Sequence, residues 1–223
     1  MLKFRSIADD IAGQTGREGD VPSEIAGFFQ GTGMPDGVWW HALWPAPAHI
    51  IAAAGVRPGM DVVDLCCGDG WFTLPVARIA RHVTAIDIDP DLLQATRRRL
   101  DEQGMRNYDA ILGDAYDVAA LAGHPRDFIL LANVLHGVSD PHRLAAAIRS
   151  ALVPGGRLAI INWHARPREE TRVLGQPRGP QTESRMSPQQ TVAAVVPGGL
   201  GFMRVVELPP YHYAAVFARR PGD

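Results

Sequence analysis

The residues best placed for chemistry lie in two short segments, Asp64–Thr73 and the apolar run that ends at Asp87. The first has the pattern of a buried strand, a turn with Gly68 and Gly70, and the start of a helix; the second has the pattern of the next strand, closed by a carboxylate. Glycines let a backbone turn come close to a ligand, and a carboxylate at this place accepts hydrogen bonds from ribose hydroxyls. The spacing therefore predicts a nucleoside site at one edge of an α/β sheet.

The elements that must position these residues alternate along the chain. Strand-like runs cover 61–66, 83–88, 109–113, 127–134 and 157–163, and helical patterns cover 70–80, 90–103, 115–121 and 141–152. This alternation predicts parallel strands with helices on both faces. Near the end of the chain, Phe202–Leu208 and Tyr211–Ala218 are joined only by Pro209-Pro210, a link that fits antiparallel neighbours. We therefore predict a Rossmann-like, doubly wound α/β sheet of seven strands, mostly parallel, with an antiparallel last strand.

Two segments lie outside this alternation. Residues 1–44 are expected to form an N-terminal arm, and residues 45–223 the main domain. Residues 165–186 follow a strand and contain three prolines and two glycines. Loops longer than about 12–15 residues in a compact domain are usually functional or disordered. Because this loop leaves the carboxyl end of a strand, where open α/β sheets bind ligands, we expect it to act with the arm as a lid.

Composition narrows the class of protein. The 223 residues carry a formal net charge of -2, and Lys3 is the only lysine, so the overall charge gives no reason to expect a nucleic acid partner. No run approaches the roughly 18 apolar residues of a membrane span, and no signal peptide is expected. Cys66 and Cys67 are adjacent in a strand and point to opposite faces, so we expect no disulfide. These features favour a cytoplasmic protein with neither a membrane nor a metal partner.

The glycine turn separates two classes of nucleoside cofactor. A dinucleotide fingerprint needs a third glycine, whereas the bulky Trp71 and Phe72 follow Gly70 directly. The segment Asp64-Leu65-Cys66-Cys67-Gly68-Asp69-Gly70 instead resembles the first motif of the class I S-adenosylmethionine-dependent methyltransferases, an acid followed by three alternating glycines. Cys66 stands in place of the first glycine, and the Cys-Cys pair is similar to that of quinone-biosynthesis methyltransferases.

The resemblance continues in order through Asp87, Gly113-Asp114-Ala115, Leu131–His136 and Leu152–Leu158, and covers about residues 45–163. It implies an S-adenosylmethionine site in which Asp87 binds both ribose hydroxyls, Asp114 accepts a hydrogen bond from the adenine amine, and Asn133 lies beneath the methionine part. The cofactor-binding residues that it implies are Asp64, Cys66, Gly68, Gly70, Asp87, Ile88, Asp114, Ala115 and Asn133.

Methyl transfer from a sulfonium to a small-molecule acceptor requires mainly alignment of the reactants and exclusion of water. His136 is the candidate general base, since a neutral imidazole accepts a proton from a hydroxyl or an amine; orienting its own loop is the alternative role. The candidate acceptor contacts are His164, Arg178, Arg185, Trp40 and Tyr211. For the arginines, which suit carboxylates or phosphates, salt bridges within the loop are the alternative. For the aromatic residues, simple packing is the alternative, and strand alternation predicts Tyr211 and Tyr213 on one face.

The sequence thus predicts an S-adenosylmethionine-dependent methyltransferase that acts on a small molecule. A nicotinamide-dependent oxidoreductase and a non-catalytic S-adenosylmethionine-binding module are the alternatives. Neither the acceptor atom nor the oligomeric state can be read from the sequence, because one scaffold hosts many reactions.

Overall fold

A computed structural model of the chain describes residues 37–222, so residues 1–36 of the predicted N-terminal arm lie outside the described part. The helices are α1 (Gly37–Leu43), α2 (Pro47–Ala54), α3 (Thr73–Ile79), α4 (Pro90–Glu102), α5 (Val118–Leu121), α6 (Pro141–Ala151) and α7 (Pro188–Val195), with short 3-10 helices η2 (Ala115–Asp117), η3 (Leu135–Gly137), η4 (Arg168–Glu170), η5 (Thr182–Ser184) and η6 (Val196–Gly198). The strands are β1 (Asp61–Leu65), β2 (His82–Asp87), β3 (Tyr108–Leu112), β4 (Arg126–Ala132), β5 (Leu152–Trp163), β6 (Arg172–Val173), β7 (Gln176–Pro177), β8 (Gly201–Leu208) and β9 (His212–Ala218).

Seven strands form one sheet in the order β3-β2-β1-β4-β5-β9-β8. Strands β1 to β5 are parallel, whereas β9 runs antiparallel to both of its neighbours, β5 and β8. The predicted fold is therefore confirmed, including the hairpin that ends the sheet at Pro209-Pro210, whose peptide bond is cis. The chain winds outward in both directions from β1, so the loops after β1 and β4 diverge and leave a crevice at the carboxyl ends of these strands.

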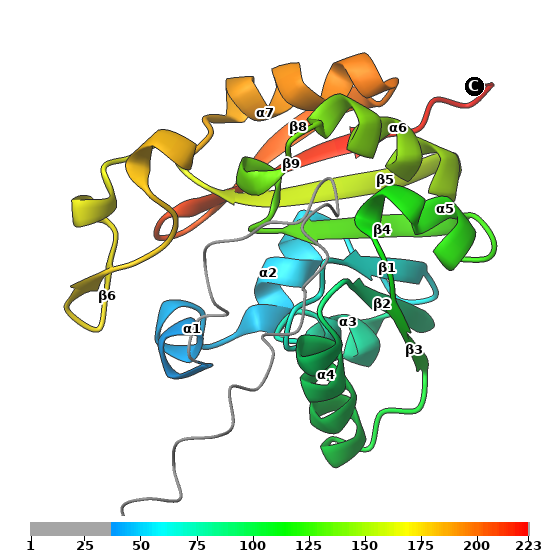
Figure 1. Ribbon diagram of the computed structural model, residues 1–223, viewed down its shortest axis with the longest axis horizontal. Coiled ribbons are helices and arrows are strands. Elements are labelled where there is room, and N and C mark those ends of the chain that lie inside the picture. Colours follow the sequence, from blue (N-terminus) through cyan, green and yellow to red (C-terminus); the bar gives the residue numbers. More distant parts are fainter. Residues whose placement is uncertain (1–36, 223) are drawn as a thin grey trace, which may run out of the picture.

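Alternation along the strands divides the core into two layers. Val62, Phe128 and Leu130 face one side of the sheet and pack with residues of α1, α2 and α3, whereas Val63 and Ile129 face the other side and pack with α5, α6 and α7. Figure 1 shows these two groups of helices on opposite faces of the sheet. All five side chains are fully buried, and burial of one such side chain stabilises the fold by about 1.5–3 kcal/mol. The sheet is therefore a rigid base for the loops at its edge.

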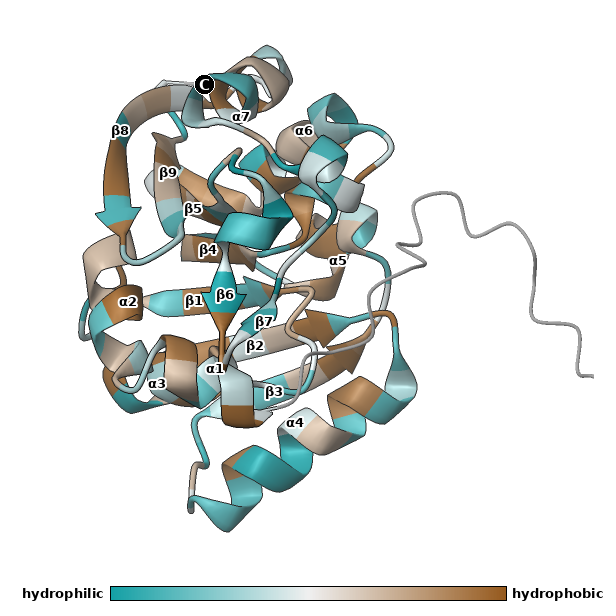
Figure 2. Ribbon diagram, turned by 90° about the vertical axis from the view of Figure 1, so that its left-hand side faces the viewer, coloured by the Kyte–Doolittle hydropathy of each residue, from teal (hydrophilic) through white to brown (hydrophobic). Residues whose placement is uncertain are grey.

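Helix α4 shows how the sequence sets the position of one of these loops. The Asp89 side chain accepts hydrogen bonds from the backbone N–H groups of Asp91 (2.8 Å) and Leu92 (3.1 Å), and Pro90 occupies the first turn. A buried stripe of Leu93, Thr96 and Leu100 holds the helix to the sheet, and Figure 2 shows that much of its remaining surface is hydrophilic. The cap thereby fixes the segment between Asp87 and the helix. Within residues 37–222, no helix is long and apolar enough to cross a membrane.

Candidate functional site

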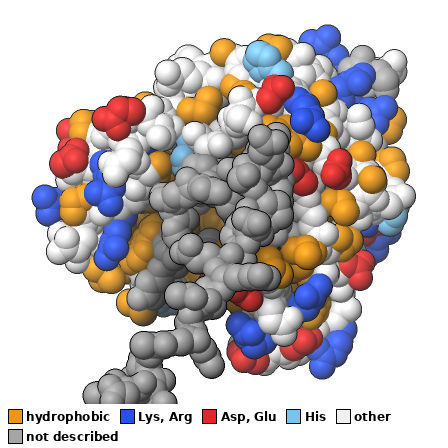
Figure 3. All heavy atoms as spheres, viewed as in Figure 1, with side chains coloured by type: hydrophobic (Ala, Val, Ile, Leu, Met, Phe, Trp, Pro, Cys, Tyr) orange, Lys and Arg blue, Asp and Glu red, His pale blue; other side chains and the backbone are white. Residues whose placement is uncertain are grey.

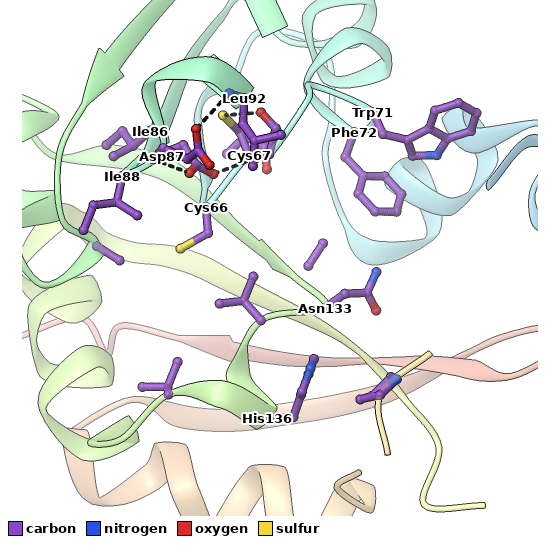
Figure 4. Close-up of a pocket in the computed structure, with 18 of the residues that line it drawn as sticks. Cys66, Cys67, Trp71, Phe72, Ile86, Asp87, Ile88, Leu92, Asn133 and His136 are labelled. Carbon is purple, nitrogen blue, oxygen red and sulfur yellow. Dashed lines mark hydrogen bonds between the residues drawn. The ribbon is translucent and has the colours of Figure 1, made fainter. Parts of the chain in front are cut away.

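A cavity of about 650 Å³ opens at the carboxyl ends of β1 to β5. Small-molecule sites usually have volumes of about 300–1,000 Å³. Figure 4 shows the side chains that converge on it from the two sides of the crevice. The residues predicted to contact cofactor or substrate that line it are Asp64, Cys66, Gly68, Asp87, Ile88, Asp114, Ala115, Asn133, His136, Trp40 and Arg178. The structure therefore brings together most of the residues that the sequence singled out.

Cys66 adopts a left-handed backbone conformation, which explains why the methyltransferase motif has a glycine at this position. Its φ is 59°, and those of Gly68 and Gly70 are 57° and 80°, so all three lie in the left-handed region that glycine enters without a steric penalty. The turn is closed by hydrogen bonds from the Cys67 N–H to the Ile86 carbonyl (3.0 Å) and from the Gly70 N–H to the Cys67 carbonyl (3.1 Å). The cysteine therefore preserves the turn, and its thiol points into the cavity (Figure 4).

Gly70 serves the turn by packing rather than by lining the cavity. A Cβ atom at this position would lie 3.0 Å from the side chain of Thr96 and 3.1 Å from its Cα. The Thr96 hydroxyl in turn donates to the Gly68 carbonyl (2.7 Å). Gly70 thus lets α4 approach the turn closely, and the turn is held against that helix.

Asp87 ends β2 with both carboxylate oxygens directed at backbone donors. Oδ2 accepts from the Gly68 N–H (2.7 Å) and Oδ1 from the Asp89 N–H (3.0 Å). Burial raises the pKa of this carboxyl, and the backbone hydrogen bonds oppose that effect. Each carboxylate oxygen can accept two hydrogen bonds, so Asp87 keeps capacity for two ribose hydroxyls while it fixes the turn.

Asp64 is a buried acid at the base of the same turn. Its Oδ2 accepts a hydrogen bond from the Thr73 hydroxyl (2.6 Å) at the start of α3. Burial raises its pKa to about 7; the Thr73 hydrogen bond opposes the shift, and the charge of Asp87 adds to it. Asp64 therefore connects β1 to α3 and exchanges its proton near neutral pH.

Two further residues leave polar atoms without partners in the described part of the chain. Asp114 accepts from the Tyr116 N–H through Oδ1 (2.9 Å) and begins η2, while no hydrogen bond engages its Oδ2. Asn133 has a φ of 60°, and its buried Oδ1 has no hydrogen-bond partner. Buried polar atoms are normally paired, so the Asn133 oxygen is an acceptor suited to a donor of a bound molecule, and the half-buried Asp114 offers a second acceptor.

His136 lies on η3 and lines the cavity opposite Cys66 (Figure 4). Burial, and then the charge of Arg185, lower its pKa to about 4. The imidazole is therefore neutral at pH 7, and a neutral imidazole can accept a proton.

Aromatic side chains form one wall of the cavity, which we call the aromatic wall and define as Trp39, Trp40, Trp71, Phe72 and Trp163. The ring centroids of Trp39 and Trp40 lie 4.4 Å apart in a stacked arrangement, and Trp40 stacks on Trp71 at 6.5 Å. The indole Nε1 atoms of Trp40 and Trp71 are buried and have no hydrogen-bond partner among the described residues. The wall therefore offers apolar faces together with two open donors.

Residues 165–186 form a compact excursion that contains η4, the β6–β7 hairpin and η5. Figure 3 shows charged side chains of both signs at the left of the view, where Figure 1 places this segment. Arg168, Arg178, Gly179 and Pro180 line the cavity. Gly179, with a φ of 85°, lies so close to Trp163 that a Cβ atom would meet the indole at 2.7 Å. The segment is thus seated on the aromatic wall.

Arg185, an expected acceptor contact, lies inside this excursion and does not line the cavity. Its guanidinium is 5% exposed and donates to the Pro180 carbonyl (3.0 Å), the Arg178 carbonyl (2.9 Å) and the Thr171 hydroxyl (2.9 Å). Three such hydrogen bonds to neutral acceptors hold the turns of the segment together. Arg185 therefore helps to fix the backbone of Arg178 by donating a hydrogen bond to its carbonyl.

His164 and Tyr211 also lie away from the cavity lining. His164 Nε2 is 2.9 Å from Glu207 Oε2, and the Tyr211 hydroxyl donates to the Arg172 carbonyl (3.0 Å). The expectation that Tyr211 and Tyr213 share one face is wrong, because β9 begins after Tyr211. Tyr211 stacks on Trp163, whereas Tyr213 packs in the opposite layer.

Sequence reasoning missed Trp163 as a site residue, and it did not single out Trp39 and Arg168 from the groups to which they belong. Trp39 neighbours the predicted Trp40, and Arg168 belongs to the predicted lid loop, so both carried a local signal. Trp163 ends β5 at the same sheet edge as the cofactor turn, which was its only signal. Among residues 37–222, no group of three or more His, Cys, Asp or Glu side chains is arranged to hold a metal ion.

Comparison with known proteins agrees with this geometry. Residues 62–156 match the family described as a methyltransferase domain. The ubiquinone biosynthesis O-methyltransferase of Xanthomonas campestris pv. campestris (strain B100) is 31% identical over 138 residues, which are 58% of this chain and 57% of that protein. The enzyme of the same name from Xylella fastidiosa (strain 9a5c) is 33% identical over 55% of this chain and 53% of its own. The chain thus spans just over half the length of the curated relatives it matches.

Solved structures show the same fold. A SAM-dependent methyltransferase from Aquifex aeolicus has a TM-score of 0.68 and 21% identity, covering 80% of this chain and 91% of its own. The [4+2]-cyclase SpnF has a TM-score of 0.63 and 18% identity, covering 88% of this chain and 87% of its own. The sequence match over residues 62–156 and the shared fold confirm the resemblance to the class I S-adenosylmethionine-dependent methyltransferases that the sequence predicted.

Proposed function

We propose that this protein transfers a methyl group from S-adenosylmethionine to a small-molecule acceptor. The observation that carries the proposal is the charge of the cradle around the glycine turn. Asp87, Asp89 and Asp114 line this part of the cavity together with Asp64, whose pKa of about 7 leaves it partly protonated at neutral pH. Such a lining repels the pyrophosphate of a dinucleotide and suits a nucleoside that carries hydroxyls, an amine and a positive sulfur. A nicotinamide cofactor is therefore disfavoured on electrostatic grounds as well as by the missing third glycine.

The residues of the cradle have separate roles in this proposal. Asp87 holds the ribose hydroxyls, Asp114 receives the adenine amine, and Asn133 offers its Oδ1 to the amino-acid part. Gly68 and Cys66 supply the turn that lets the backbone approach. When bound, S-adenosylmethionine supplies a methyl group already activated by its sulfonium charge. The protein then needs to align the acceptor with that methyl group and to exclude water.

His136 is the group in position to receive the acceptor's proton. Its imidazole lines the cavity and is neutral at pH 7, because its pKa is lowered to about 4. A base with so low a pKa is weak, so it assists only an acceptor whose proton becomes acidic as the new bond forms. This condition favours a hydroxyl or an amine that gains positive charge during transfer.

Residues 165–186, together with residues 37–44 of the arm, are proposed to cover the acceptor half of the cavity. The segment follows β5 and is seated on Trp163 through Gly179. Most of its side-chain hydrogen bonds are internal to the segment, which suits an element that covers the site as one unit. The size of the cavity favours a small acceptor over a macromolecule, and the two free cysteines fit a reducing cytoplasm.

The test is binding followed by turnover. We expect S-adenosylhomocysteine to bind in calorimetry and NADH not to bind under the same conditions. Turnover of S-adenosylmethionine labelled in the methyl group is then measured against hydroxyl, amine and thiol acceptors, with the product identified by mass. Tight binding of NADH, or absence of S-adenosylhomocysteine binding, would overturn the proposal. Because a [4+2]-cyclase shares the fold, cofactor binding without transfer to any acceptor would point to a different reaction.

A further inference from the structure

We infer that the methyl acceptor is a flat, largely apolar molecule that carries an anionic group, with that group held by Arg168 and Arg178. The inference rests on the proposed function and names the substrate class of the same cavity. It comes from three observations on residues that line the cavity: arginines without a carboxylate partner and buried donors without an acceptor among the described residues, and the aromatic wall.

The first observation is positive charge without a counter-ion. Arg168, Arg178 and Arg185 come together in one segment, yet none of them forms an ion pair with a carboxylate in residues 37–222. Arg168 donates only to the Gly179 carbonyl (3.1 Å) through its side chain, and Arg178 has no side-chain hydrogen bond to any described residue. Burial lowers the pKa of Arg185, the charge of Arg168 adds to this effect, and the charge of Glu169 opposes it. Of the three, Arg168 and Arg178 line the cavity, and an anion there would form charge-assisted hydrogen bonds with them.

The second observation is an excess of donors. The buried Arg178 Nε and the indole Nε1 atoms of Trp40 and Trp71 have no acceptor among the described residues. All three belong to residues that line the cavity. Leaving a buried donor unsatisfied costs about 1–3 kcal/mol. Among these residues, Arg178 carries the positive charge, and a ligand group that only accepts hydrogen bonds, such as a carboxylate or a phosphate, suits its guanidinium.

The third observation is the aromatic wall, which sets the shape of the acceptor. The Arg178 guanidinium lies 5.8 Å from the ring centroid of Trp39, and Trp39, Trp40 and Trp71 follow one another as a stacked series. Stacked or edge contacts between aromatic groups add about 0.5–1.5 kcal/mol beyond the area they bury. A planar ring therefore matches the wall, and the arginine at its rim matches the anion.

The charges are separated along the sheet, and this separation assigns the arginines to the acceptor. The four acids of the cradle lie in or follow β1, β2 and β3, whereas Arg168 and Arg178 follow β5, two strands beyond β1 in the sheet order. His136, the candidate base, lines the same cavity as Arg168 and Arg178. An anion held there lies beside the group that acts on the acceptor.

The experiment uses 2-naphthoate and its neutral analogue 2-naphthamide as probes, titrated by calorimetry into the full-length protein saturated with S-adenosylhomocysteine. We expect the naphthoate to bind at least about tenfold more tightly, the usual gain for a hydrogen bond that becomes charge-assisted. Arg168→Gln and Arg178→Gln should each remove most of that preference, with little change for the naphthamide or for S-adenosylhomocysteine. Arg166→Gln is the matched control, because it removes the same charge from an exposed position of the same segment.

Three results would overturn the inference. The first is equal affinity for the two probes, and the second is an Arg166→Gln effect as large as those of the other two arginines. The third is competition between the naphthoate and S-adenosylhomocysteine, or loss of S-adenosylhomocysteine affinity in the arginine variants, because the arginines would then serve the cofactor's own carboxylate. If S-adenosylhomocysteine does not bind at all, the proposed function fails, and the same titration on the free protein still tests the arginine site separately.

Discussion

Replacing Asp87 by asparagine removes the charge from the nucleoside cradle and keeps its shape. The carboxylate accepts from Gly68 and Asp89 and, in the proposed complex, from two ribose hydroxyls. An asparagine retains one acceptor oxygen and presents an amide NH₂ in place of the other. One of the two backbone donors therefore loses its partner, and the hydroxyls lose a charged acceptor.

The size of the effect follows from these contacts. A hydrogen bond to a charged group contributes about 1.5–3 kcal/mol and a neutral one about 0.5–1.5 kcal/mol, so two ribose bonds together lose about 2–3 kcal/mol. This corresponds to a rise of roughly 30- to 150-fold in the Kd for S-adenosylhomocysteine. The unpaired backbone donor lowers the free energy of unfolding by about 1–3 kcal/mol, and relief from burying an acid whose pKa is raised offsets part of that loss.

The assay is a ligand–variant cycle in calorimetry. Adenosine and 2′,3′-dideoxyadenosine are titrated into wild-type protein and Asp87→Asn, with Asp91→Asn as a control for loss of an exposed acid on the first turn of α4. We expect Asp87→Asn to weaken adenosine strongly and dideoxyadenosine little, and Asp91→Asn to change neither. An equal loss for both ligands, or a Kd for S-adenosylhomocysteine within about twofold of wild type, would refute the role of Asp87 at the ribose.

Three further predictions concern the turn and the candidate base. Gly70→Ala should lower the free energy of unfolding by at least about 2 kcal/mol in urea titrations. The control is Gly104→Ala, because Gly104 also has a positive φ but a Cβ atom there would meet no atom within 4 Å; it should lower the free energy of unfolding by only about 1 kcal/mol. Equal losses would mean that contact with Thr96 is unimportant. For Asp64, the folded-state pKa is raised to about 7 from 3.8, so the folded protein holds the proton more tightly and loses stability as pH rises from 4 to 7. The free energy of unfolding should therefore fall by about 1.4 kcal/mol per pH unit in that interval, and Asp64→Asn should abolish this slope. Parallel plots of the free energy of unfolding against pH for the two proteins would contradict this. His136→Gln should lower kcat by about 100-fold without changing the Kd for S-adenosylhomocysteine, and a kcat within about twofold of wild type would remove the imidazole from proton transfer.

The sequence contained the fold almost completely, because the signals involved are local. Periodicity and glycine placement predict β1, β2 and the turn between Asp64 and Gly70, and the cap at Asp89 predicts the start of α4. The prediction that Asp87 faces the ligand needs only the rule that parallel strands share a carboxyl edge. Gly70 was predicted to bind the cofactor but lies outside the cavity lining. Its role is to let Thr96 of α4 approach the turn, and periodicity in the sequence cannot show that these two residues are neighbours.

The half of the cavity proposed to bind the acceptor was less predictable, because it is formed by contacts between elements that are distant in the sequence. Arg185 and Arg178 look alike in sequence, yet one donates to three oxygens of its own segment and the other is left with open donors. Which of them turns inward depends on the path of the backbone between Thr171 and Pro180. Trp163 becomes part of the wall only because Gly179 is seated on it and Trp39 packs beside it. Contacts of this kind join elements far apart in the chain.

All five indoles of this protein sit in a single neighbourhood, since Trp44 also stacks on Trp40. Tryptophan emission from the molecule therefore originates beside the cavity. A ring-shaped compound that enters should quench or shift this light directly, and exposure of the indoles on denaturation should move it to the red. One optical signal thus follows both occupancy and unfolding, with no dye or label attached.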